Sequence, residues 1–191
     1  SYRFFRDSAD NNQFLKDLVA ALKKKSLNKR RSWNSLIKAL SHKTTSRTTY
    51  IITARGHKPS TIFEAFKHLQ KEGIIKHLPL QRNIYPVSYK YDLEAETLEE
   101  CKGKILIDIL DYYAEKIKKQ KYNSFHKFSF SDDDLSIITK VAEVLGPHVK
   151  NSRWPTINIY LHYTGEHSTL RPGTYVIGYG GELLFQRKFR D

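Results

Sequence analysis

Three adjacent carboxylates, those of Asp132, Asp133 and Asp134, follow an apolar run at residues 128–130. Neighbouring carboxylates repel one another unless a cation or a helix N-terminus offsets their charge. Asp134 suits the N-cap of the helix predicted after it, and a cap needs only one acid. The other two offer the oxygen ligands that Mg²⁺ takes together with water and phosphate. The sequence therefore predicts a magnesium site at Asp132 and Asp133.

A second polar cluster, residues 53–57, follows the apolar pair Ile51-Ile52 and precedes another predicted helix. The hydroxyl of Thr53 can hold a phosphate oxygen, and the helix N-terminus adds N–H donors and partial positive charge. Arg55 can add a bidentate contact. We therefore expect Thr53, Arg55, Gly56 and His57 to bind the phosphate of a substrate. The alternatives are that Thr53 only closes the strand, that Arg55 is solvated and that His57 lies on the surface.

Two lysines precede or open the helix predicted over residues 104–119. An ammonium group at the start of this helix can neutralise a phosphate or an aspartyl-phosphate. Either Lys102 or Lys104 can take this role. A solvated lysine at a helix start is the simpler interpretation of either residue.

The elements that must position these groups alternate between strand and helix from residue 49 to residue 163. Short apolar runs predict strands at 50–52 and 84–87, and the alternation of apolar with polar residues predicts strands at 125–130 and 156–163. Helical periodicity predicts helices from a Thr61–Glu64 capping box to Gly73, over 104–119, and from 135 to a stop at Gly146-Pro147. Such alternation implies parallel strands in one sheet, with the chemistry at their carboxyl ends.

The flanking segments predict N-terminal helices over 11–25 and around 33–40, and a C-terminal β-hairpin over 173–189 that turns at Gly180-Gly181. A length of 191 residues with 39% hydrophobic and 28% charged residues suits a single α/β domain over 1–191. No apolar run is long enough to span a membrane. The single cysteine, Cys101, indicates a structural role and a cytoplasmic or other reducing compartment.

The chain has 33 lysines and arginines against 20 acidic residues, a net charge of +13. Such a charge attracts phosphate-rich partners, among them nucleic acid, nucleotides and anionic lipid. A solvated basic surface without a specific partner is the alternative interpretation.

The order of these motifs resembles that of the haloacid dehalogenase superfamily, in its phosphatase-like members. Residues 50–59 are similar to the second motif of that superfamily, the helix that opens on Lys104 to the third, and residues 128–134 to the fourth. The resemblance covers residues 49–163. It implies a Rossmann-like three-layer sandwich with a mostly parallel sheet, and a Mg²⁺-dependent phosphohydrolase that acts on a phosphorylated substrate.

The resemblance also implies roles for single residues. Thr53 would hydrogen-bond the transferring phosphoryl group, and Lys104 would steady the nucleophile. Asp132 and Asp133 would hold Mg²⁺. Residues 11–45 would form a small helical cap or insertion.

The superfamily's first motif, an Asp-x-Asp that carries the nucleophile, is not found before Thr53. The nearest acids, Asp7 and Asp10, stand three residues apart. A shifted register, in which Asp132 is the nucleophile, Asp134 the acid–base and Thr164-Gly165 the second motif, is an alternative. The chain is thus expected to be an enzyme if an upstream Asp-x-Asp exists. Otherwise we expect a non-catalytic relative that binds nucleic acid or a ribonucleoprotein through its basic surface.

Overall fold

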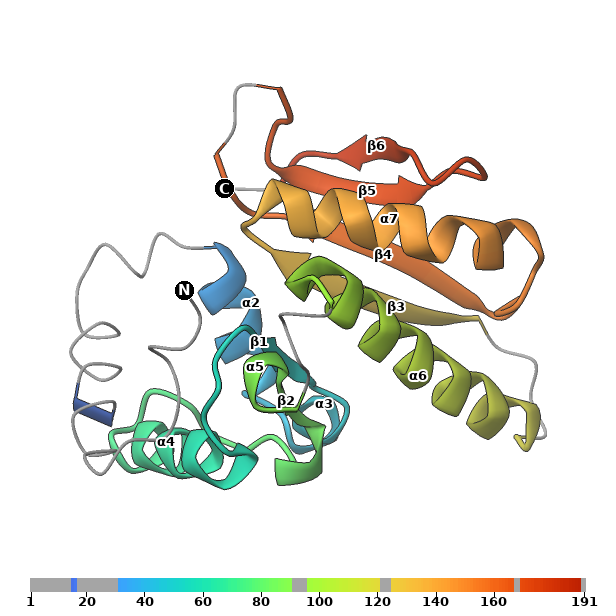
Figure 1. Cartoon of the computed structure of the whole chain (residues 1–191). Helices are drawn as coiled ribbons and strands as arrows, with labels where there is room; N and C mark the ends of the chain where they lie inside the picture. Colours follow the sequence, from blue (N-terminus) through green and yellow to red (C-terminus); the bar gives the residue numbers. More distant parts are fainter. Residues whose placement is uncertain (1–14, 17–30, 91–95, 121–124, 167–168, 190–191) are drawn as a thin grey trace. The chain divides into compact units, whose positions relative to one another are not determined.

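The computed structural model of this chain describes residues 15–16, 31–90, 96–120, 125–166 and 169–189. Its internal contacts divide the chain into two compact units, residues 1–96 (unit 1) and residues 97–191 (unit 2). The sequence predicts one parallel sheet that runs through residues 49–163. The described strands instead form two sheets, a two-stranded one in unit 1 and a four-stranded one in unit 2 (Figure 1).

The described part of unit 1 is mostly helical and contains one short parallel sheet. Its elements are α2 (Arg31–Ala39), α3 (Lys43–Arg47), β1 (Ile51–Thr53), α4 (Pro59–Lys71), η2 (Gln81–Asn83), β2 (Ile84–Pro86) and α5 (Val87–Lys90). β1 pairs with β2 in parallel, with Ile51 opposite Ile84 and Thr53 opposite Pro86. Both predicted strands are confirmed. Pro86 is tolerated because it lies at the end of a strand that pairs on one side in this sheet.

Helix α4 begins two residues earlier than the sequence predicts. Pro59 occupies the first turn, where its fixed φ suits a helix and its missing N–H costs nothing. Lys58 is the N-cap and makes no side-chain cap hydrogen bond, so the predicted Thr61–Glu64 capping box is wrong. The C-terminal prediction is confirmed, because Gly73 has φ +73°, the left-handed conformation that ends helices.

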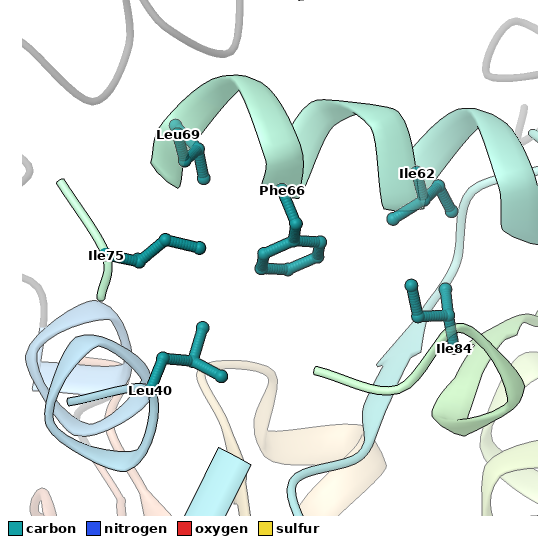
Figure 2. Close-up of a cluster of buried hydrophobic side chains, with 6 residues drawn as sticks. All are labelled: Leu40, Ile62, Phe66, Leu69, Ile75 and Ile84. Carbon is teal, nitrogen blue, oxygen red and sulfur yellow. The ribbon is translucent and has the colours of Figure 1, made fainter. Parts of the chain in front are cut away.

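The core of unit 1 is a small cluster of aliphatic side chains around one phenylalanine. Its buried members are Leu40, Ile62, Phe66, Leu69, Ile75 and Ile84. Figure 2 shows Phe66 and its helical neighbours pointing from α4 toward the other three side chains. The i, i+4, i+7 spacing along α4 places its three members on one face. The cluster joins α4 to the chain that follows α2 and to the start of β2.

Unit 2 combines two long helices with a mixed sheet. Its elements are α6 (Leu98–Lys118), β3 (His126–Asp132), α7 (Leu135–Lys150), β4 (Ile157–Tyr163), β5 (Gly173–Ile177) and β6 (Leu183–Arg187). The strand order is β3-β4-β5-β6, with β3 parallel to β4 and the other two pairs antiparallel. The two predicted strands and the C-terminal hairpin are confirmed, and the α/β class is shown.

One face of the unit 2 sheet is buried beneath the helices. Phe130, Leu161 and Tyr175 stand side by side in the strand register, and all three are buried. Figure 1 shows α6 and α7 next to each other over one face of this sheet, and α7 contacts β3, β4 and β5. On the opposite face Lys127 and Asn158 are exposed. The described part of unit 2 is therefore arranged as one helical layer on one sheet.

Helix α6 begins six residues before the predicted start at residue 104. A complete capping box marks the observed start: the Thr97 hydroxyl accepts the Glu100 backbone N–H at 3.2 Å, and a Glu100 carboxylate oxygen accepts the Thr97 N–H at 3.2 Å. Lys102 and Lys104 consequently lie inside the helix rather than at its N-terminus. Helical periodicity therefore sets the direction in which each lysine side chain leaves α6.

Helix α7 continues through Gly146 and Pro147, which the sequence predicts as its stop, and ends at Lys150. A Cβ on Gly146 would lie 2.6 Å from the Cα of Gly181, so the glycine permits a close approach to the β5–β6 turn. Gly181 itself has φ +80° in that turn. Tertiary packing therefore accounts for a glycine that resembles a helix terminator in the sequence.

No helix in the described ranges is both long and apolar enough to cross a bilayer.

Candidate functional site

A buried ion pair lies at the carboxyl end of β3. The ammonium nitrogen of Lys102 is 2.7 Å from Oδ2 of Asp132, and the two side chains are 6% and 10% exposed. The other carboxylate oxygen, Oδ1, accepts the backbone N–H of Asp134 at 3.0 Å. The Asp132 carbonyl accepts the N–H of Thr164, which follows β4, at 3.0 Å. Asp132 is therefore held by its backbone and by both carboxylate oxygens.

The position of Lys102 follows from the apolar stripe of α6. Lys102 precedes the buried Ile105 and Leu106 by three and four residues, the spacing of one helix face. Lys104 is exposed. The structure thus places Lys102, the alternative of the sequence analysis, on Asp132, while the preferred Lys104 lies on another face of α6.

The remaining two acids of the cluster have different surroundings. Asp134 is the N-cap of α7, as predicted, and its Oδ1 accepts the backbone N–H of Ser136 at 2.9 Å. Asp133 is exposed. A Cβ on Gly165 would overlap the carbonyl oxygen of Asp133, so the loops after β3 and after β4 are in close contact. Unit 2 therefore brings together Lys102, the three acids and Thr164-Gly165.

The acidic loop influences a buried tyrosine. Burial raises the pKa of the Tyr163 hydroxyl above its ordinary value, and the negative charges of Asp134, Asp133 and Glu166 raise it further. Tyr163 is 2% exposed. The loop therefore presents a negative field beside the ion pair, which favours the approach of a cation.

The fit of a magnesium ion depends on Asp132 and Asp133. Among the residues that the structure describes, no group of three or more His, Cys, Asp or Glu side chains is arranged to hold a metal. Two carboxylates nevertheless match the number that Mg²⁺ takes when water and phosphate complete its shell. Each oxygen of Asp132 has two lone pairs and accepts one hydrogen bond here, so a second is available for a ligand bond. The donor set therefore consists of two carboxylates, one of which is already bound to the Lys102 ammonium.

The predicted phosphate loop in unit 1 lies between β1 and the N-terminus of α4. The Thr53 hydroxyl oxygen accepts the backbone N–H of Arg55 at 3.4 Å. Gly56 and His57 are buried, and His57 is only 5% exposed, so the alternative of a surface histidine is wrong. Burial lowers the pKa of the Arg55 guanidinium below its ordinary value. The first turn of α4 contains no acid.

Hydrogen bonding ties this loop to the end of β2. The Ser88 hydroxyl in α5 donates to the carbonyl oxygen of Ala54. Unit 1 therefore groups Thr53, Arg55, Gly56 and His57 around one strand end, as the sequence predicts. The structure assigns this group to unit 1 and the Asp132 group to unit 2.

Searches of protein-family models, curated proteins and solved structures found no match to this chain. We therefore infer the chemistry of the two strand ends from the residues that form them. Asp7, Asp10 and most of the predicted 11–25 helix lie outside the described residues, as does part of the predicted cap.

Sequence reasoning missed a pocket in unit 1. It has a volume of about 460 Å³, and its walls include Arg82, Tyr85 and Tyr89. The sequence pattern drew attention only to the strand in this segment. One sequence signal could have indicated this pocket. Tyr85 and Tyr89 are two aromatic residues four positions apart, one in a predicted strand and one after it, and Arg82 lies nearby in the sequence.

Proposed function

We propose that this chain is a Mg²⁺-dependent phosphohydrolase of the haloacid dehalogenase type, or a part of one, with Asp132 at its centre. The observation that carries the proposal is the buried Lys102–Asp132 pair, 2.7 Å apart at the carboxyl end of the parallel strands β3 and β4. Ligands of parallel sheets bind beyond the carboxyl ends of the strands. The three-layer sandwich of that superfamily is part of the same proposal.

The cost of burying two charges supports a functional role for the pair. A buried ion pair adds little stability compared with apolar side chains of similar volume, because both ions lose their hydration. A positioned ammonium beside a carboxylate is useful where negative charge develops on a phosphoryl group. Lys102 supplies that ammonium from the rigid α6, and Asp132 is fixed by the Asp134 and Thr164 backbone N–H groups.

Two contacts favour different registers. The Lys102 ammonium on Asp132 suits the shifted register, in which Asp132 is the nucleophile, whereas the cap at Asp134 suits the first. In the shifted register Asp134 would act as acid and base, but its carboxylate accepts the N–H of Ser136 as the cap of α7. In the first register Asp132 and Asp133 are the metal ligands, and Mg²⁺, when bound, neutralises charge on the phosphate. The carboxylate nucleophile that covalent transfer needs then belongs to an Asp-x-Asp motif, which residues 31–53 do not contain.

The test is hydrolysis of 4-nitrophenyl phosphate with and without Mg²⁺, together with binding of inorganic phosphate in the presence of Mg²⁺. We expect Asp132→Asn, which keeps the shape of the side chain, to lower turnover by roughly a hundredfold or more. Lys104→Ala, on the exposed face of the same helix, is the matched control and should leave turnover unchanged.

Phosphate binding separates an enzyme from a part of one. Binding that needs Mg²⁺ and Asp132, without turnover, identifies the chain as the part that lacks the nucleophile. The absence of both turnover and Asp132-dependent phosphate binding would overturn the proposal, provided that circular dichroism shows the variant to be folded.

A further inference from the structure

The positive charge of the chain is concentrated in unit 1. Residues 1–96 contain 19 lysines and arginines against 8 acidic residues, a net charge of +11, whereas residues 97–191 contain 14 against 12, a net charge of +2. Residues 18–63 form a run of 46 residues with 11 lysines and arginines and no acid. A field of one sign on one unit attracts a polyanion to that unit.

Few acids in the described part of unit 1 are available to neutralise this charge. Within its described residues only Glu64, Glu72 and Glu96 are acidic, and Glu64 is already 2.7 Å from the ammonium of Lys67. The basic surface of unit 1 is therefore not balanced by ion pairs within the described residues. A phosphate backbone would supply the missing negative charges.

The unit 1 pocket adds aromatic surface to this charge. Tyr89 is 52% exposed, and Tyr85 is half-buried with its ring centroid 6.1 Å from that of Tyr50. Arg82 stands on the same wall and is exposed. An open pocket of about 460 Å³ beside one exposed and one half-buried aromatic ring suits a planar base better than a bulky folded partner.

A second arginine is fixed close to this wall. The side-chain amide of Asn83 donates to the carbonyl oxygens of Arg47 at 3.1 Å and Thr49 at 3.4 Å. This contact joins the C-terminus of α3 to η2, which contains Arg82. The backbone of Arg47 therefore lies next to η2, and the side chains of Arg47 and Arg82 are both exposed.

We propose that unit 1 binds single-stranded nucleic acid at this pocket, with a base against Tyr89 and Tyr85 and the flanking phosphates on Arg82 and Arg47. Stacking on aromatic rings beside a basic groove is the usual mode for single strands and tolerates many sequences. A duplex keeps its bases stacked on one another and cannot use the pocket. The inference is independent of the phosphohydrolase proposal, since it uses none of the residues at the Asp132 site.

The test is fluorescence anisotropy of a fluorescein-labelled 12-nucleotide oligo(U) RNA with the full chain, over a range of salt concentrations. The affinity should fall as salt rises, with a log–log slope of about −0.7 for each phosphate neutralised. Tyr89→Ala should weaken binding by roughly tenfold, in keeping with the loss of one stacked base. Arg82→Ala should weaken binding and make the slope shallower by about 0.7.

Matched controls come from unit 2. Tyr112 is 55% exposed and Lys127 is exposed, so Tyr112→Ala and Lys127→Ala should leave the affinity within about twofold. Three outcomes would overturn the inference: no binding at low salt, equal or tighter binding of a 12-base-pair duplex, or binding that Tyr89→Ala leaves unchanged. Circular dichroism verifies that each variant is folded.

Discussion

The two units of this chain differ in charge, in architecture and in the group at their strand ends. Unit 1 has a net charge of +11, a two-stranded sheet and a strand end at residues 53–57 that contains no acidic residue. Unit 2 has a net charge of +2, a four-stranded sheet and a strand end with three acids and one buried lysine. The net charge of +13 for the whole chain therefore does not show that the two units differ in net charge. Unit 1 suits a polyanion, and unit 2 suits a cation with a phosphate.

Each unit contains one tryptophan, which makes the comparison measurable. Trp33 in α2 packs against the core of unit 1, and Trp154 is buried in unit 2. A Trp154→Phe background reports on unit 1, and a Trp33→Phe background reports on unit 2. The substitutions below are expected to act on one unit and to leave the other unchanged.

The largest effect is expected from Phe66→Ala in unit 1. Phe66 is at the centre of the six-residue core, so its truncation leaves a cavity and should cost about 3–5 kcal/mol of unfolding free energy. Urea unfolding followed by Trp33 emission should shift strongly, and oligo(U) binding should be lost with it. An equal shift of the Trp154 transition would contradict the division into two units.

The next effect is expected from Lys102→Ala in unit 2. The substitution leaves the Asp132 carboxylate buried without its cation and should cost about 3 kcal/mol, seen in urea unfolding followed by Trp154 emission. The double variant Lys102→Met with Asp132→Leu should recover most of the stability, because apolar side chains replace buried ion pairs at little cost. A single variant as stable as the wild type would show that the pair is not buried as described.

A smaller effect is expected from Gly146→Ala. The added methyl group would clash with the backbone of Gly181, and we expect a loss of about 1–3 kcal/mol in unit 2.

Gly73→Ala is the matched change in unit 1. No atom lies within 4 Å of its added Cβ, and only the left-handed backbone opposes it, at about 1–2 kcal/mol. Gly73→Asn should cost less than Gly73→Ala, whereas Gly146→Asn should cost more than Gly146→Ala. The reverse order at either position would contradict the assigned cause.

The smallest effect concerns Asp111, which links α6 to the loop before β4. Its carboxylate oxygens lie 3.0 and 2.7 Å from Nε and Nη2 of Arg153, and it accepts the indole N–H of Trp154 at 2.8 Å. Burial acts to raise the pKa of Asp111, but the hydrogen bonds from Arg153 and Trp154 outweigh it and hold the pKa below its ordinary value of 3.8. The folded state therefore favours the carboxylate.

The pH dependence follows from that direction. The stabilisation is present above the ordinary pKa of Asp111 and is lost as the pH falls through the lower pKa of the folded state. Asp111→Asn should therefore destabilise unit 2 slightly at pH 7 and flatten its loss of stability as the pH falls below about 4. Urea unfolding at several pH values, followed by circular dichroism, provides the measurement. An identical acid profile for variant and wild type would show that the contact is not made in solution.

Local patterns in the sequence predicted most of the helices and strands. They did not predict that the chain divides into two units. The strands β1 and β2 were predicted from short apolar runs, and β3 and β4 from the alternation of apolar with polar residues. Both patterns report on burial and do not depend on the partner strand. Whether the strands share one sheet depends on long-range pairing, which no short pattern contains. Helix ends failed where packing overrode local preference, as at Gly146, whose role is a contact with Gly181.

The candidate site was predicted in part. The acids at residues 132–134 and the cap at Asp134 were found from their position after a strand, and the loop at residues 53–57 from the same rule. Lys102 was ranked below Lys104 because the helix was predicted to begin at residue 104. Once α6 begins at Leu98, the apolar stripe through Ile105 and Leu106 selects Lys102. The Thr97–Glu100 capping box is the sequence signal that marks this start.

Isothermal titration of inorganic phosphate into the chain, with and without Mg²⁺, tests the central proposal most directly. The account predicts binding that requires Mg²⁺, is lost in Asp132→Asn and is retained in Lys104→Ala. Binding that is independent of Mg²⁺ and unaffected by Asp132→Asn, or no binding at millimolar phosphate, would contradict it.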